Sequence, residues 1–201
     1  MKTLLLTGFE PFLTFSINPT EQIVKELDGL VIGDYKINSK VLPVDFEKAG
    51  VELLELITEV KPNAIISLGL AGGRFKVTPE RIAININDGE KDNKGNIRMD
   101  EQIEANGEAA YMSTLPIRKM VDSLISSGLP AEISNTAGTY LCNHVMYTAL
   151  HYAATNKLTI PAGFIHIPAS HALAIEHGKV PSWSHEDLKR AVTLCVKTLS
   201  E

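Results

Sequence analysis

Short apolar runs alternate with helical patterns along most of the chain. Residues 3–7 (TLLLT), 64–68 (AIISL) and 163–167 (GFIHI) are predominantly apolar without a helical or alternating period, which is typical of strands covered on both faces. Further strands are predicted within 35–44 and over 131–135. At 80–87 (ERIAININ), apolar and polar residues alternate, which predicts a strand with Ile82, Ile84 and Ile86 on one side.

Helix-start signals follow several of these strands. Asn18 predicts an N-cap, with Pro19 at the first helical position and Glu21 three residues beyond the cap. Asp45 predicts the cap of a second helix, whose apolar face carries Ala49, Leu53, Leu56 and Val60 and which Pro62 ends. Other helices are expected over 116–126, after the loop 136–140, and from Ser184.

Alternating strands and helices favour a three-layer α/β/α sandwich with a mostly parallel, mixed central sheet. We expect residues 1–201 to form a single domain. The polar segment 88–112 is too long for an ordinary connection, so it is interpreted as a functional flap or a mobile insertion. Ligands of such folds bind beyond the carboxyl ends of the strands.

Composition narrows the class of protein. The chain has 201 residues, 44% of them hydrophobic, and a domain of this length buries roughly 70% of its unfolded surface without a metal or disulfide. A net charge of −5 and the absence of a basic cluster argue against nucleic-acid binding. Two cysteines without a CxxC pair favour a reducing, cytoplasmic location, and no apolar run has the length of a signal or membrane segment.

Cys142 is the candidate nucleophile. It falls in the first turn of a predicted helix, where free N–H groups and the helix dipole favour an ionised thiol with a lowered pKa. The alternative is a packed core cysteine, because Cys142, Met146, Ala149 and Ala153 share helical spacing. Cys195, in the last helix, is expected to pack.

A nucleophilic cysteine needs a base, and His166 is the candidate among six histidines. It ends an apolar strand, just before Pro168. A hydrogen-bonded core imidazole is the alternative. His144 and His151 point away from the Cys142 face at helical spacing. His171, His177 and His185 lie in polar or loop-like sequence, where solvation is expected, and so remain outside the site.

Glu80 is the candidate for the third group, which holds the imidazole. It begins an otherwise apolar alternation next to the glycine-rich turn 69–74, and a solvated carboxylate paired with Arg81 is the alternative. Other chemistries are weakly supported. The sequence GLAGG (69–73) lacks the spacing of a dinucleotide or phosphate loop, and no zinc-ligand pattern occurs.

Seven stretches together resemble pyroglutamyl peptidase type I, or pyrrolidone carboxyl peptidase, a family of cytosolic cysteine peptidases. They are TGFEPF (7–12), NPTE (18–21), GLAGGR (69–74), ERIAIN (80–85), STLPI (113–117), SNTAGTYLCNHVMY (134–147) and GFIHIP (163–168). The resemblance implies catalysis by Glu80, Cys142 and His166 without metal or cofactor. It also implies peptide substrates with an N-terminal pyroglutamyl residue, and a homotetramer.

Pyroglutamate is a neutral lactam, so its pocket needs apolar walls and no anchoring carboxylate. The resemblance favours Phe9 and Phe12 as walls, with anchoring of their loop as the alternative. It also favours a pairing of the lactam with the chain around Gly69, Leu70 and Ala71 and a contribution from Leu141. Backbone N–H groups around 140–142 are expected to form the oxyanion hole.

One departure from the family pattern falls in the segment NDGEKDNKGN (87–96). Family members often carry an active-site arginine there, whereas this segment has none. Arg98 lies farther along, and Lys91 is the candidate in its place. Losing one such donor typically costs about 10²–10³-fold in rate. The missing arginine makes a non-catalytic small-molecule-binding homologue one rival function. A cysteine amidase of different acyl specificity is a second rival.

Overall fold

A six-stranded sheet with strand order β2-β3-β1-β4-β8-β5 forms the centre of the computed structural model, which describes residues 1–200. Four inner strands run parallel and the edge strands β2 and β5 run antiparallel to their neighbours, which confirms the mostly parallel, mixed sheet. The strands are β1 (Lys2–Phe9), β2 (Val31–Ile32), β3 (Tyr35–Leu42), β4 (Ala64–Leu70), β5 (Thr78–Pro79) and β8 (Ala162–Ile167).

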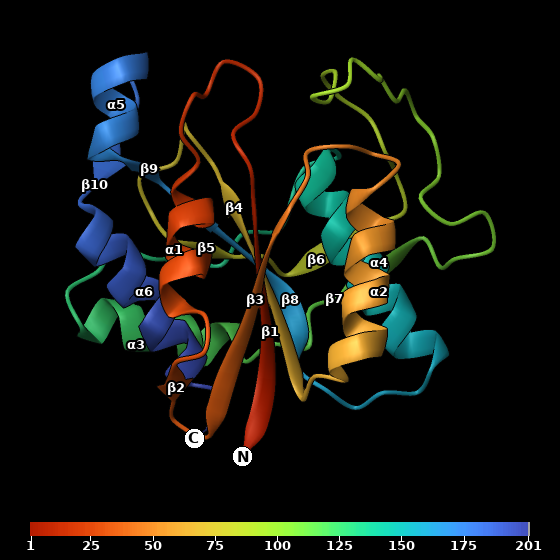
Figure 1. The fold of residues 1–201 in the computed structure, drawn as a ribbon, viewed down its shortest axis with the longest axis horizontal. Helices are drawn as coiled ribbons and strands as arrows, with labels where there is room; N and C mark the ends of the chain where they lie inside the picture. The colour runs from red at the N-terminus through yellow and green to blue at the C-terminus, as the bar shows by residue number, and fades with distance from the viewer. Residues whose placement is uncertain (201) are drawn as a thin grey trace.

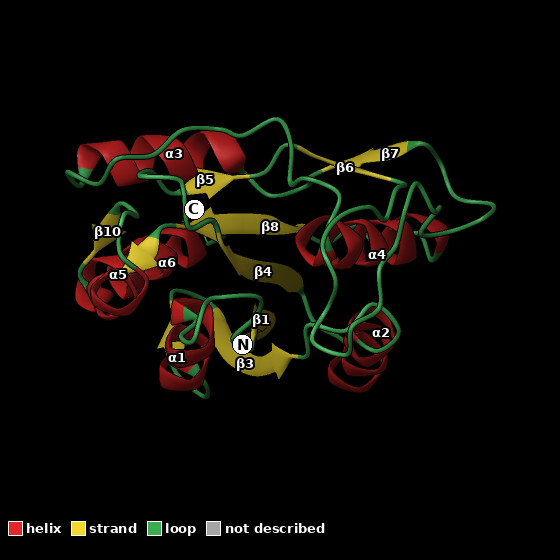
Figure 2. Cartoon of the chain, turned by 90° about the horizontal axis from the view of Figure 1, so that it is seen from above, coloured by secondary structure: helices red, strands yellow, loops and turns green. Residues whose placement is uncertain are grey.

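Helices cover both faces of this sheet, as Figure 2 shows from above. One face carries α1 (Pro19–Leu27), α3 (Ile117–Ser126) and α6 (His185–Lys197), and the other carries α2 (Ala49–Val60) and α4 (Leu141–Thr155). Smaller elements are the pair β6 (Ile82–Ile84) and β7 (Ala110–Met112), the pair β9 (Ala169–Ser170) and β10 (Ser182–Trp183), and α5 (His171–His177). The predicted α/β/α layering is confirmed.

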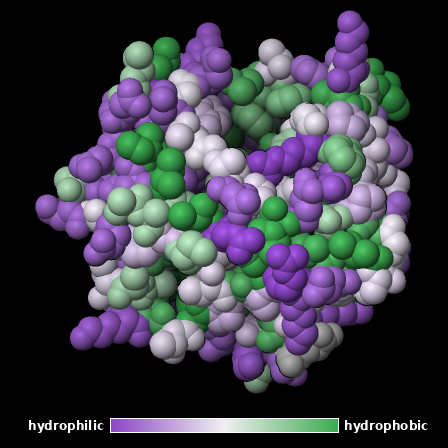
Figure 3. All heavy atoms as spheres, turned by 180° about the vertical axis from the view of Figure 1, so that it is seen from behind, coloured by the Kyte–Doolittle hydropathy of each residue, from purple (hydrophilic) through white to green (hydrophobic). Residues whose placement is uncertain are grey.

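The apolar run in β1 shows why the strands read as continuously hydrophobic. Leu4 and Leu6 pack into the core beneath α1, α3 and α6, whereas Leu5 packs into the core beneath α2 and α4. Because both faces of the sheet are covered, neither set of alternating side chains meets water. On the face turned away from the viewer of Figure 1, hydrophobic residues are interrupted by hydrophilic ones (Figure 3).

The N-cap signals in the sequence predicted the start of one helix correctly and placed the start of another too early. The Asn18 side chain accepts a hydrogen bond from the Thr20 N–H (3.1 Å), as expected of an N-cap before Pro19. The second helix begins at Ala49 and not directly after Asp45. The Asp45 carboxylate instead accepts from the N–H groups of Glu47 (2.8 Å) and Lys48 (3.2 Å), which closes a turn before the helix.

Two predicted strands are corrected. Residues 131–135 form no ladder: only isolated bridges join Ala131 to Val77 and Ser134 to Glu80. The Ser134 hydroxyl accepts from the Thr136 N–H (3.3 Å), so a side-chain turn replaces further pairing. Within 80–87, only Ile82–Ile84 is a strand, and it pairs with β7 outside the main sheet.

The C-terminal third also differs from the prediction. Residues 171–177, interpreted as loop-like, form α5, because the Ser170 side chain caps it by accepting from the Leu173 N–H (3.2 Å). The last helix begins after Ser184, whose side chain accepts from Asp187 N–H (3.1 Å), as predicted. Within residues 1–200, no helix is long and apolar enough to cross a membrane.

The carboxyl ends of the parallel strands meet at one edge of the sheet, at the top of Figure 1, opposite the two chain termini. In the same view the loop after β1 rises from this edge, and the long segment 88–112 starts there and then descends along the right side to β7. The segment is tied to its surroundings. Asp92 is buried and accepts from the Phe46 N–H (3.0 Å), and the Asn93 side chain donates to Glu10 (2.9 Å) and to the Pro11 carbonyl (2.9 Å).

Candidate active site

Glu80 and His166 form a hydrogen-bonded pair at the carboxyl end of the sheet. His166 Nδ1 lies 2.7 Å from Glu80 Oε1, and the two residues are 5% and 0% exposed. β8 supplies His166, while Glu80 follows β5 and is held by its N–H donating to the Phe164 carbonyl (2.9 Å). An ionised carboxylate only accepts hydrogen bonds, so Nδ1 carries the proton and Nε2 is left as the base.

Glu80 stays ionised although it is buried, because its hydrogen-bond partners stabilise the carboxylate. Burial raises the pKa of the carboxyl, but hydrogen bonds from His166, Ser134 and Arg74 hold it below its ordinary value. Burial lowers the pKa of His166 more than Glu80 raises it, so the imidazole is neutral at rest. The site therefore contains an anionic carboxylate that orients a neutral base.

Arg74 is a residue that the sequence reasoning missed. Its Nη1 lies 2.6 Å from Glu80 Oε1, so the guanidinium and the imidazole share one carboxylate oxygen. Arg81, the expected partner of Glu80, instead donates from Nε to Asn135 Oδ1 (2.7 Å). The interpretation of Glu80 as a solvated carboxylate paired with Arg81 is wrong. Only the position of Arg74, at the end of the glycine-rich turn before Glu80, could have indicated its role.

Cys142 is the second residue of α4, and its sulfur lies against β4. A Cβ atom built on Gly69 would be 2.9 Å from Cys142 Sγ, so the sulfur occupies the space that a side chain at position 69 would fill. Gly69 is the register partner of His166 across the β4–β8 pair. The thiol, the imidazole and the glutamate are thus brought to one edge by α4, β8 and the chain after β5.

The expected lowering of the Cys142 pKa is wrong for the resting site. Burial, with a contribution from the Glu80 charge, raises the pKa of the thiol to about 12, although Arg74 and a backbone hydrogen bond act in the opposite direction. Desolvation of the thiolate exceeds the benefit of the helix N-terminus. At neutral pH the thiol is therefore protonated beside a neutral imidazole.

The remaining histidines have other partners. His144 is buried between α4 and α2: its Nδ1 lies 3.0 Å from Asn87 Oδ1, and burial lowers its pKa to about 4. His151 stacks on Tyr147 and lies 3.0 Å from the Tyr111 hydroxyl. His171, His177 and His185 contact Ser182, the Phe15 ring and Glu26, away from Cys142.

A small, mostly apolar pocket opens onto Cys142. Four of the predicted substrate-binding residues line it: Phe9, Phe12, Leu70 and Leu141. Asn18, Val44 and Tyr140 also line it and were not predicted as pocket residues. Ala71 is less suited to pairing with a ligand, because its N–H donates to the Ile167 carbonyl (3.0 Å) and its carbonyl accepts from the Arg74 N–H (2.9 Å).

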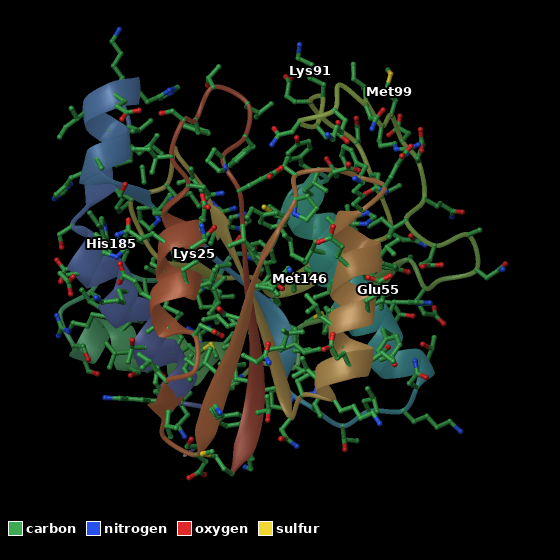
Figure 4. The ribbon with its side chains drawn as sticks, viewed as in Figure 1. Lys25, Glu55, Lys91, Met99, Met146 and His185 are labelled. Atoms are coloured by element: carbon green, nitrogen blue, oxygen red, sulfur yellow. The ribbon has the colours of Figure 1, made fainter. Side chains whose placement is uncertain are left out.

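Neither Lys91 nor Arg98 substitutes for the expected arginine. The Lys91 side chain is exposed and points outward at the top of Figure 4, while its carbonyl accepts from the Tyr140 hydroxyl (3.1 Å). Arg98 lies 3.0 Å from Glu101 and 3.8 Å from Glu47. Cys195 is buried in the core of α6, as expected of a packing residue. Residues 1–200 contain no acidic, histidine or cysteine cluster suited to a metal ion.

Comparison with known proteins identifies a family and close relatives. The family model described as pyroglutamyl peptidase matches residues 1–201. The pyrrolidone-carboxylate peptidase of Oceanobacillus iheyensis is 55% identical over 199 residues, covering 99% of this chain and 100% of the relative. That of Halalkalibacterium halodurans is 52% identical over 197 residues, covering 98% of each chain. The solved pyrrolidone carboxyl peptidase from Thermococcus litoralis superposes with a TM-score of 0.95 at 43% identity, covering 99% of this chain and 93% of that one.

Proposed function

The chain belongs to the pyroglutamyl peptidase family, and from this premise we propose that Cys142, His166 and Glu80 hydrolyse the amide bond after an N-terminal pyroglutamyl residue. The protein is a pyroglutamyl peptidase, a hydrolase of the cysteine type that acts on peptides. The observation that carries the residue assignment is the buried hydrogen bond between Glu80 and His166 (2.7 Å). The register of β4 and β8 pairs His166 with Gly69, and the Cys142 sulfur lies against Gly69.

Reaction begins from the neutral pair. His166 Nε2 takes the thiol proton as the sulfur attacks the carbonyl carbon, so the thiolate need not exist at rest. Glu80 accepts from Nδ1–H and stabilises the imidazolium that this transfer creates. The first N–H groups of α4 have no acceptor within the helix, and they face the negative charge that develops on the carbonyl oxygen.

Collapse of the tetrahedral intermediate breaks the carbon–nitrogen bond. The His166 imidazolium gives its proton to the leaving amine, which leaves the pyroglutamyl group on Cys142 as a thioester. His166 then removes a proton from water, which attacks the thioester carbonyl and releases pyroglutamate with the thiol restored. The residues that line the pocket carry no formal charge, which suits a lactam ring whose nitrogen is acylated.

The expected assembly and location form part of the proposal. The family resemblance favours a homotetramer in the cytoplasm, and two free thiols are compatible with a reducing compartment. Light scattering after size exclusion should give four times the chain mass of 21.9 kDa. A particle of one chain mass that retains full activity would contradict the tetramer.

Hydrolysis of chromogenic amides tests the assignment. Wild-type protein should hydrolyse the pyroglutamyl amide but neither the prolyl nor the free-amine aminoacyl amide, because only the first presents a neutral lactam. The Cys142→Ser variant should lose at least about 10³-fold in kcat/KM, since serine is a far weaker nucleophile beside the same base. Cys195→Ser is the matched control and should keep full turnover. Loss of activity in the control alone would overturn the assignment.

A further inference from the structure

The Arg74 guanidinium bonds three acceptors on two segments that surround the catalytic groups. Its Nη1 lies 2.6 Å from Glu80 Oε1 and 2.6 Å from the Thr78 hydroxyl, and its Nη2 donates to the Thr136 carbonyl (3.2 Å). Thr78 belongs to β5, and Thr136 belongs to the loop that leads into α4 and Cys142. One side chain therefore ties the Glu80 segment to the segment that carries the nucleophile.

The backbone of Arg74 is fixed as well. Its N–H donates to the Ala71 carbonyl (2.9 Å), which closes the turn that follows Gly69 and Leu70 in β4. The Arg74 side chain is 32% exposed, whereas the Glu80 side chain is fully buried. Arg74 thus lies on the outer side of the carboxylate, and His166 lies on its inner side.

We propose that Arg74 is a positioning residue of this active site, which fixes the Glu80 carboxylate and through it the ring of His166. The inference rests on the proposed function, because it concerns the same catalytic groups. Arg74 does not line the pocket beside Cys142, and its direct contact with the catalytic groups is its bond to Glu80. A planar guanidinium can bond several acceptors at fixed angles, which a lysine ammonium cannot reproduce.

The electrostatic effect of Arg74 has the same sign at each catalytic group. Its hydrogen bond helps to hold the pKa of the buried Glu80 down, and its positive charge lowers the pKa of His166 and of the Cys142 thiol. The titratable groups around Glu80 are His166 from β8, Cys142 from α4 and Arg74 itself. Without Arg74, both Glu80 and His166 should bind protons at a higher pH.

The test compares the pH profiles of Arg74 variants with that of a neighbouring arginine. In Arg74→Gln and Arg74→Met, the acidic limb of kcat/KM should move up by about one pH unit, and kcat should fall about 10- to 100-fold with KM nearly constant. Arg74→Lys keeps the charge, so its limb should stay near the wild-type position while kcat recovers only in part. Arg81→Gln is the matched control, because Arg81 bonds Asn135 and not Glu80, and its profile should be unchanged.

Alkylation of Cys142 by iodoacetamide, followed by mass spectrometry, supplies a readout without substrate. At fixed neutral pH the rate should fall several-fold in Arg74→Gln and not in Arg81→Gln, because Arg74 favours the thiolate. The alkylation rate tests the role of Arg74 separately from the proposed peptidase function. The proposed function fails only if the wild type does not turn over pyroglutamyl amides. An unchanged acidic limb in the neutral variants would overturn the role of Arg74. If Arg74→Gln and Arg74→Met do not fold, an Arg74→Lys variant whose kcat equals that of the wild type would overturn the role of Arg74.

Discussion

At the residue scale, the chemistry depends on which group holds the proton. Burial leaves Cys142 protonated and His166 neutral, while Glu80 stays ionised through its bonds to His166 and Arg74. In the proposed reaction, charge separation is thus delayed until the sulfur attacks, when Glu80 is already in place to stabilise the imidazolium. The carboxylate has one task in this account, which is to make proton transfer to His166 favourable.

Replacing Glu80 by glutamine tests that task. The Glu80→Gln variant keeps the size of the side chain and an oxygen that accepts from Nδ1–H, but it removes the charge that stabilises the imidazolium. We expect kcat/KM to fall about 10²–10⁴-fold. Steady-state kinetics on a pyroglutamyl amide, with thermal unfolding to verify folding, measure the effect. A folded variant within tenfold of the wild type would show that the charge is not needed.

Sequence reasoning selected the three residues of the proposed catalytic site but not their protonation. Each of them ends or begins an element at the same edge of an α/β sheet, which a pattern of strands and helices reveals. The thiol pKa depends on how many atoms surround the sulfur, and the role of Arg74 depends on how a loop folds back. A local sequence pattern encodes neither the surroundings of the sulfur nor the path of the loop. The thiol pKa and the contacts of Arg74 therefore follow only from the three-dimensional structure.

At the element scale, the close approach of α4 to β4 defines the position of Cys142, the proposed nucleophile. Gly69 permits it, because a Cβ there would lie 2.7 Å from the Phe164 ring and 2.9 Å from Cys142 Sγ. Phe164 is fully buried, so its ring has no free space to enter. The absence of a side chain at one strand position therefore sets the distance between two layers.

Gly69→Ala should disturb the site more than the fold as a whole. Displacement of the sulfur by a few tenths of an ångström should lower kcat by at least about tenfold, and overpacking should cost about 1–3 kcal/mol of the free energy of unfolding. Kinetics and denaturant unfolding measure the two effects. Gly73→Ala is the matched control, because a Cβ at Gly73 has no neighbour within 4 Å. Equal behaviour of the two variants would contradict this explanation.

Elements with strong periodicity were predicted well, and those without it were not. The inner strands β1, β4 and β8 were recognised because two covered faces give continuous apolar runs. Residues 131–135 resemble a strand in composition but form only isolated bridges, since Ser134 closes a turn with Thr136. Side-chain hydrogen bonds in a single turn outweigh a weak strand preference.

At the scale of the whole molecule, the two cores share the central sheet. Alternate residues of β1 belong to opposite cores, so loss of one core exposes the strand that supports the other. We therefore expect residues 1–201 to unfold as one cooperative unit, as predicted for a single domain. Coincident transitions by fluorescence and circular dichroism would support this expectation, and two separate transitions would contradict it.

Buried His144 should make that unfolding sensitive to pH. Its pKa of about 4 in the folded chain lies below the ordinary value of 6.5, so between these values the unfolded chain binds more protons. Stability should be fully present above pH 6.5 and should fall, by on the order of 3 kcal/mol, as pH drops towards 4. Denaturant unfolding at pH 7 and 4.5 measures it. His144→Gln should show a smaller loss than the wild type, whereas the exposed-site control His171→Gln should match the wild type.

The central claim is that Cys142 forms a covalent intermediate with the pyroglutamyl group. Acid quenching during turnover of a pyroglutamyl amide, followed by peptide mapping and mass spectrometry, tests it most directly, because thioesters survive acid. The account predicts a pyroglutamyl thioester on the peptide that contains Cys142 and none on the peptide that contains Cys195. A rapidly quenched, active enzyme that carries the acyl group on Cys195 or on another side chain would contradict it.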